Sequence, residues 1–197
     1  MPTDVTPASR VRAADELKHA ALEQFAASGF AATSLQQIAD AAGYAKSSVL
    51  YHYGSKEALL EAAIEPAVEA VEAALERFLA GSGTDPRAEL VRDIVDLLIA
   101  HRQAVHVFLI QGPSLSELPI IARADLAIRR LDAALCGQGE SVEDQVRFGI
   151  ALGGAAFLLT AGRGFTDEAA LPGDDDLRAA LHRIIPDILA PVRHAES

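Results

Sequence analysis

Short polar and cationic side chains gather in one part of the N-terminal third, where their types and spacing suit contacts with a nucleic acid. The group comprises Lys46, Ser47, Ser48, Tyr51 and His52. Hydroxyl and cationic groups contact phosphates, and polar groups on a helix read base edges in the major groove. The chemistry that these residues support is therefore binding to double-stranded DNA.

Two short helices on either side of Gly43 must position these residues. Thr33 or Ser34 caps the first helix, and the second runs from about residue 45 to residue 51. This arrangement is the helix-turn-helix pattern, in which the second helix enters the major groove. Lys56 follows at the start of the next helix, where a point charge and a helix N-terminus together suit a phosphate. On spacing alone, an ordinary helical hairpin with solvated polar residues explains the pattern equally well.

A resemblance to a known family favours the first interpretation. The stretch GFAATSLQQIADAAGYAKSSVLYHYGSKEALL, residues 29–60, resembles the DNA-binding domain of the TetR family of transcriptional regulators, and the similarity covers about residues 11–60. The family commonly has Tyr-x-His-Phe where this chain has Leu50-Tyr51-His52-Tyr53, so we assign the phosphate-contacting ring to Tyr51. The DNA-binding residues implied by this resemblance are Thr33, Ser34, Lys46, Ser47, Ser48, Tyr51, His52 and Lys56.

The rest of the chain also shows helical spacing, and no alternating run of β-branched and aromatic residues predicts a strand. We predict an all-α fold of about nine helices. The expected divisions are a flexible arm over residues 1–10, the helix-turn-helix domain over 11–56 and a helical ligand-binding and dimerisation domain over 57–197. Pro66 should kink or split the helix that starts near Ser55.

Net charge, cysteine count and the length of apolar runs limit the classes of protein to which this chain can belong. The formal net charge is −11, which by itself disfavours a nucleic-acid binder. Residues 1–60, however, carry five basic and six acidic side chains, so the acidity lies almost entirely in the remainder. One cysteine excludes an internal disulfide framework. The longest apolar run, residues 148–162, is too short for a membrane span. We expect a cytoplasmic protein without a signal peptide or a membrane partner.

The C-terminal part contains no motif that names a ligand. The resemblance implies that this part binds a small-molecule inducer and dimerises through its last two long helices. The candidate ligand-binding residues are His101, His106, Phe108, Gln111, Arg123 and Phe148. The candidate dimer-interface residues are Gly149, Gly153, Ala156, Phe157, Leu181 and Ile185.

Catalytic and metal-binding motifs are missing from the sequence. His101 and His106 lie five positions apart, about 140° around a helix, which does not suit a shared metal. The acidic run 174–176 is better explained by the dipole of the helix that it opens. We therefore expect no enzyme, metal or cofactor, but a homodimeric regulator, a repressor released from a palindromic operator by an inducer. The alternatives are a helical small-molecule-binding protein or enzyme with no DNA role, and a module that binds another protein through its Gly/Ala-rich helix.

Overall fold

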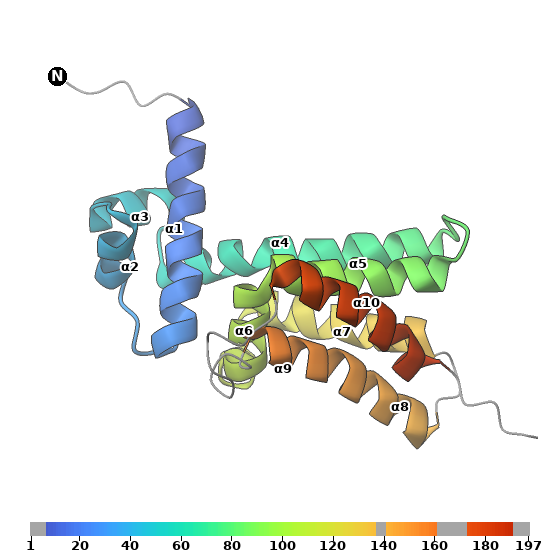
Figure 1. Cartoon of the computed structure of the whole chain (residues 1–197). Coiled ribbons are helices and arrows are strands. Elements are labelled where there is room, and N and C mark those ends of the chain that lie inside the picture. The colour runs from blue at the N-terminus through green and yellow to red at the C-terminus, as the bar shows by residue number, and fades with distance from the viewer. Residues whose placement is uncertain (1–6, 137–140, 161–172, 191–197) are drawn as a thin grey trace, which may run out of the picture. The chain divides into compact units, whose positions relative to one another are not determined.

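The computed structural model describes residues 7–136, 141–160 and 173–190, and every regular element in these ranges is a helix (Figure 1). The helices are α1 (Pro7–Ser28), α2 (Leu35–Ala42), α3 (Lys46–Tyr53), α4 (Lys56–Leu79), α5 (Pro86–Ala100), α6 (Arg102–Gln111), η1 (Gly112–Leu115), α7 (Pro119–Cys136), α8 (Val142–Phe148), η2 (Gly149–Gly153), α9 (Gly154–Thr160) and α10 (Asp174–Leu189). Since η1 extends α6, and α8, η2 and α9 are continuous, the described ranges hold nine helices. The all-α prediction is confirmed.

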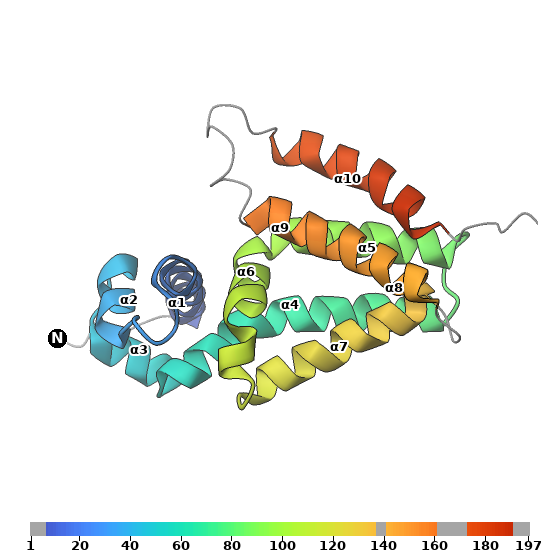
Figure 2. The same ribbon diagram turned by 90° about the horizontal axis from the view of Figure 1, so that it is seen from below.

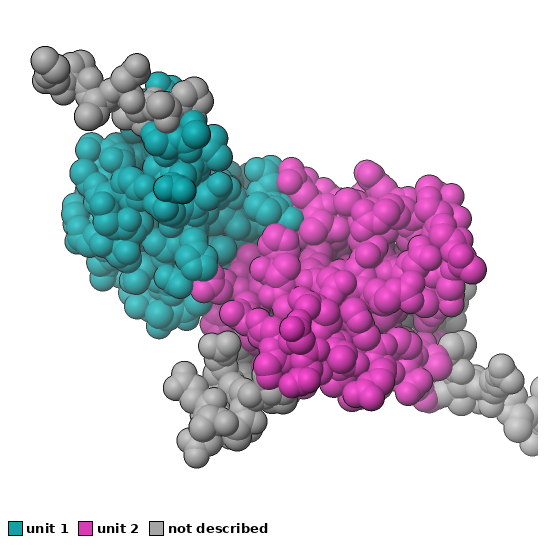
Figure 3. Space-filling view, turned by 45° about the horizontal axis from the view of Figure 1, so that its top comes forward, with its two compact units in different colours: residues 1–66, 107–122 teal, residues 67–106, 123–197 magenta. Residues whose placement is uncertain are grey.

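The chain divides into two compact units, shown in different colours in Figure 3. Unit 1 consists of residues 1–66 and 107–122, and unit 2 of residues 67–106 and 123–197. The functional boundaries that we place at residues 10 and 56 stay predictions.

Unit 1 is built around the first three helices. Helix α1 contributes Leu17, Ala21 and Phe25 to the core, all at 0% exposure, and the spacing of four residues places them on one face. The helix begins at Pro7, so the last four residues of the predicted arm are helical, and the first six lie outside the described residues. Helix α4 is continuous through Pro66, so the predicted split does not occur.

Local signals in the sequence set the bounds of the helix-turn-helix. The Ser34 hydroxyl accepts a bond from the Gln37 amide, and the Gln37 side chain accepts one from the Ser34 amide, which forms a capping box at the start of α2. Gly43 ends α2 at a φ of 75°, a left-handed conformation that favours glycine. Ser34, not Thr33, is therefore the cap.

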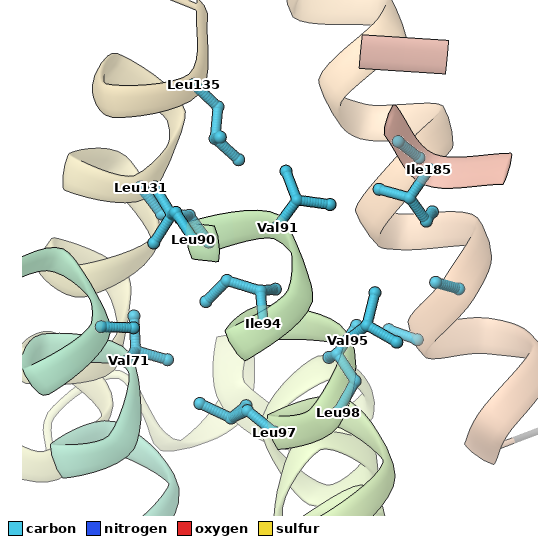
Figure 4. Packing of buried hydrophobic residues seen from close by; sticks show 14 of the residues in the cluster. Val71, Leu90, Val91, Ile94, Val95, Leu97, Leu98, Leu131, Leu135 and Ile185 are labelled. Atoms are coloured by element: carbon cyan, nitrogen blue, oxygen red, sulfur yellow. The ribbon is translucent and has the colours of Figure 1, made fainter. Parts of the chain in front are cut away.

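Unit 2 is organised around α5, which is buried along most of its length. Figure 4 shows Leu90 of α5 beside Leu131 of α7, while Val91 and Val95 lie on the side of α5 that faces Ile185 of α10. In Figure 2 the continuous helix from α8 to α9 runs alongside α10, and both pack against α5. Residues of α5 thus form the centre of the hydrophobic cluster of unit 2.

Within the described ranges, no single helix combines the length and apolar character that crossing a bilayer requires, and only the bent pair Arg102–Leu115 and Pro119–Leu135 meets those criteria together.

Arg87 joins three helices of unit 2, and we expect its loss to destabilise the unit. From the first turn of α5, its guanidinium donates to the Leu135 carbonyl in the last turn of α7 and, at 2.9 Å, to the Leu189 carbonyl at the end of α10. A cation at two helix C-termini also compensates both dipoles. Arg87→Met should lower the free energy of unfolding by about 2–3 kcal/mol, measured by urea denaturation.

Arg92 provides the control for this measurement. It lies on the same helix, is about half exposed and, among the residues that the structure describes, pairs only with Glu89, at 4.0 Å. Arg92→Met should change the free energy of unfolding by less than about 0.5 kcal/mol. Equal effects of the two substitutions would show that the carbonyl bonds of Arg87 do not stabilise the unit.

Candidate nucleic-acid interface

Helix α3 presents four exposed side chains on one face, Lys46, Ser47, Leu50 and Tyr51, which we call the exposed α3 face. At 100° per residue they fall within an arc of about 140°, with Leu50 between Lys46 and Ser47. The opposite side of α3 holds Val49 at 0% exposure, in the core of unit 1. One short helix therefore has a side that anchors it and a side that is open to a partner.

The two tyrosines that flank His52 have different surroundings. The Tyr53 hydroxyl donates to the Ala14 carbonyl at 2.7 Å, which ties α3 to α1, and burial raises the pKa of Tyr53 to about 12. Tyr51 is 72% exposed. The His52 ring is half-buried and lies 5.3 Å from the Tyr51 ring and 6.1 Å from the Tyr53 ring. Tyr51 is thus the ring that is accessible to a partner, whereas Tyr53 serves the fold.

Thr33 does not present its side chain to a partner. It is only 2% exposed. Its hydroxyl lies 2.8 Å from the carbonyl of Gly29, which follows α1, and 3.2 Å from the carbonyl of Gln24 in α1. The Thr33 side chain thus serves the fold of unit 1 in this structure, and its phosphate contact stays a prediction. Ser34, by contrast, is exposed at the N-terminus of α2.

Lys56 also has partners within unit 1. Its ammonium donates to the Phe30 carbonyl at 2.7 Å and to the Thr33 carbonyl at 2.8 Å, and it lies 4.3 Å from the centre of the Phe30 ring. An ammonium has three donors, and two of them are engaged here. Lys56 therefore helps to fix the turn formed by residues 29–33. Its predicted contact with a phosphate stays a prediction.

Gln111 holds the same turn from another helix. Its side-chain oxygen accepts from the Phe30 amide, and its side-chain nitrogen donates to the Phe25 carbonyl at 2.7 Å. We predicted Gln111 as a ligand-binding residue from its place in the sequence. Its amide is engaged at both ends with the backbone of α1 and of the following turn. A ligand contact of Gln111 stays a prediction.

The other ligand candidates are divided between the two units, and their role stays a prediction. Phe108 belongs to unit 1, where it lies beside Gly112, while the remaining four belong to unit 2. Phe148 packs against the hydrophobic cluster, burial lowers the pKa of His101, and His106 has a buried Nδ1 without a hydrogen-bond partner in the described residues. The described hollow in unit 2, about 320 Å³ and widely open, is lined by other residues, namely Ala70, Ala73, Arg77, Asp93, Asp96, Leu97 and Ala100.

Arg123 is engaged in a bidentate ion pair between α7 and α4. Its Nε and Nη2 atoms donate to the two carboxylate oxygens of Glu72, at 3.0 and 2.6 Å. This hydrogen bonding lowers the pKa of Glu72 below its ordinary value.

The Glu72–Arg123 pair gives a pH-dependent prediction. Because the pKa of Glu72 is lowered in the folded state, the pair stabilises the protein above the unfolded-state pKa, and this contribution is lost as the pH falls through the folded-state value. Glu72→Gln should therefore reduce stability at pH 7 but change it little at pH 3, when urea unfolding is compared at the two pH values. An equal loss at both pH values would contradict this assignment.

The six predicted interface residues separate into two sets. Ala156, Leu181 and Ile185 are 2–5% exposed within the core of unit 2, so they are not available to a partner in this structure. Gly149 and Gly153 are exposed, and a Cβ atom built on either would meet nothing within 4 Å. Phe157 is 48% exposed.

A row of exposed apolar side chains accompanies these glycines, and the sequence pattern alone did not single it out. We call it the apolar α8–α9 face; its members are Val142, Val146, Ile150, Phe157 and Leu158, with exposed fractions from 48% to 77%. The nearby helix α10 adds Ile184, at 52%. The spacing of 142, 146, 150 and 157 could have revealed one helical face, but only the structure distinguishes an exposed face from a buried one.

Comparison with known proteins gives a match over the helix-turn-helix. Residues 17–63 match the family model described as "Bacterial regulatory proteins, tetR family". A curated relative, the HTH-type transcriptional regulator BetI of Stenotrophomonas maltophilia (strain R551-3), is 33% identical over 115 residues, which are 56% of this chain and 58% of the relative. The aligned stretch thus spans little more than half of that relative's length.

Solved structures match over most of the chain. A TetR-family transcriptional regulator from Bordetella parapertussis 12822 has a TM-score of 0.67 at 19% identity, covering 88% of this chain and 94% of its own. The ketosteroid transcriptional regulator KstR2 of Mycobacterium tuberculosis has a TM-score of 0.65 at 15% identity, covering 89% and 92%. At these identities the likeness shows a shared fold.

Proposed function

Since residues 17–63 are a domain of the tetR family of bacterial regulatory proteins, and the chain has the fold of TetR-family regulators, we propose that it regulates transcription by binding double-stranded DNA through the exposed α3 face. The observation that carries this proposal is the geometry of α3. Its buried side is fixed by Val49 and by the Tyr53 bond to α1, while Lys46, Ser47 and Tyr51 stay open. Ser34, exposed at the N-terminus of α2, places a helix end where a phosphate can bind.

The regulator is proposed to act as a homodimer on a palindromic operator. An apolar face with adjacent exposed glycines, as on α8–α9, suits close packing against a second copy, and two-fold symmetry presents two α3 helices to two half-sites. The acidic remainder of the chain does not oppose this, because residues 1–60 are nearly neutral. The domain match and the fold likeness favour this function over an enzyme.

Release by a small molecule completes the proposal. An inducer that binds the C-terminal helices must prefer the form of the dimer that cannot bind the operator, and a ten-fold release needs about 1.4 kcal/mol of preference per dimer. Repression is the proposed outcome. The hollow lined by Arg77 and Leu97 in unit 2 is a place at which to test for such a ligand.

Fluorescence anisotropy tests the DNA-binding proposal. The protein is titrated against labelled DNA from the region upstream of its own gene and against a random duplex of equal length, at several salt concentrations. We expect a Kd of about 10⁻⁸ M or tighter for the upstream DNA and much weaker binding to the random duplex. Absence of binding to either duplex at low salt would contradict the proposed function.

A further inference from the structure

We propose that Leu50 reads the 5-methyl group of a thymine in the major groove, and so contributes to the sequence specificity of the regulator. This inference rests on the proposed function, because it needs α3 to enter the groove. It concerns a contact that the polar residues of α3 cannot make.

The exposure of Leu50 is the first observation. It is 44% exposed on a helix whose core-facing side is already occupied by Val49, so its side chain is not needed to anchor α3. Its backbone does serve the fold, because the Leu50 carbonyl accepts the Gly54 amide that ends the helix. A substitution that shortens the side chain leaves this bond in place.

The neighbours of Leu50 indicate its partner. Leu50 lies between Lys46 and Ser47 on the exposed α3 face, with Tyr51 at the edge, so a partner that contacts those polar groups covers Leu50 as well. A cation and hydroxyls around an isobutyl group match a duplex, whose phosphates line the groove. The thymine methyl is the apolar group that the four bases display on its floor. A hydroxyl or an ammonium does not bind a methyl group favourably, whereas contact with the Leu50 side chain buries the methyl group away from water.

The test first uses selection from a random duplex pool by the full-length wild-type protein, which supplies bound sequences whatever the natural operator is. Each thymine of the selected duplex is then replaced in turn by deoxyuridine, which removes one methyl group and leaves base pairing and hydrogen bonding unchanged. Affinity is measured by anisotropy at one salt concentration. At one thymine of each half-site we expect about four-fold weaker binding, since a buried methyl contributes that much.

The Leu50→Ala variant then assigns the effect to a residue. Its affinity for the thymine duplex should fall, and its affinity for the deoxyuridine duplex should equal that for the thymine duplex at the same position. Leu79→Ala, which truncates a leucine that is 77% exposed near the end of α4, is the matched control and should retain the four-fold deoxyuridine effect. Far-ultraviolet circular dichroism and the urea midpoint check that Leu50→Ala is folded.

Two results would overturn the inference. If deoxyuridine has no effect at any position, or the same effect on wild type and Leu50→Ala, then Leu50 does not read a thymine methyl, while DNA binding itself stands. If the wild-type protein selects no duplex and binds none at low salt, the inference fails together with the proposed function.

Discussion

Ile150→Asp should separate the proposed homodimer into monomers and weaken binding to the proposed operator at least about 100-fold. Ile150 is 59% exposed in the middle of the apolar α8–α9 face, next to Gly149, where a Cβ atom would meet nothing. In a two-fold interface each substitution occurs twice, so two unpaired carboxylates would be buried in an apolar contact. A penalty of about 3 kcal/mol corresponds to the hundred-fold change.

Size-exclusion chromatography with light scattering measures the mass at micromolar concentration, and anisotropy measures operator affinity. Leu79→Asp is the control, because Leu79 is more exposed than Ile150 but lies at the end of α4. It should leave both the mass and the affinity unchanged. If Ile150→Asp stays dimeric, the α8–α9 face is not the contact between copies.

The second prediction with a large effect concerns the stability of variants at Lys56 and Lys46. Lys56→Met should lower the free energy of unfolding by about 2–4 kcal/mol, because it removes two charge-assisted bonds to the Phe30 and Thr33 carbonyls. Lys46→Met should leave stability unchanged, because Lys46 is exposed and the described residues include no hydrogen bond or ion pair of its side chain.

For DNA binding we expect the reverse, a larger effect of Lys46→Met than of Lys56→Met. Lys46→Met should weaken binding to all sequences and lower the slope of log affinity against log salt by about one per subunit. Lys56→Met, compared at a temperature where it remains folded, should keep the wild-type slope. A lower salt slope for Lys56→Met would support the phosphate contact that we predicted for Lys56 from the sequence.

The sequence predicted best where the cause of a structure lies within a few residues. The cap of α2, which we placed at Thr33 or Ser34, and the break at Gly43 each depend on groups at most five positions apart. The helical spacing of the apolar residues likewise predicted the all-α fold. These parts of the fold depend on no distant residue.

Prediction was weaker where a residue's role depends on a distant partner. The sequence did not show that the Phe30 carbonyl, 26 positions earlier, lies beside the Lys56 ammonium. It likewise did not show that Glu72, 51 positions earlier, pairs with Arg123. Small residues such as Ala156 suggested an interface, but the same pattern also suits the core in which Ala156 lies. Periodicity shows that a face is apolar and does not show what covers it.

The bonds of Gln111 have a consequence for the order in which the protein is completed during synthesis. Its side chain bonds to Phe30, which lies 81 positions earlier in the chain, and to Phe25, which lies 86 positions earlier. These two bonds can therefore form only after residue 111 has left the ribosome. Until then the Phe30 amide lacks this acceptor, although every residue of the helix-turn-helix has already been made. A nascent chain that ends before α6 should therefore fold its DNA-binding helices without this restraint, and the restraint arrives with the second half of the protein.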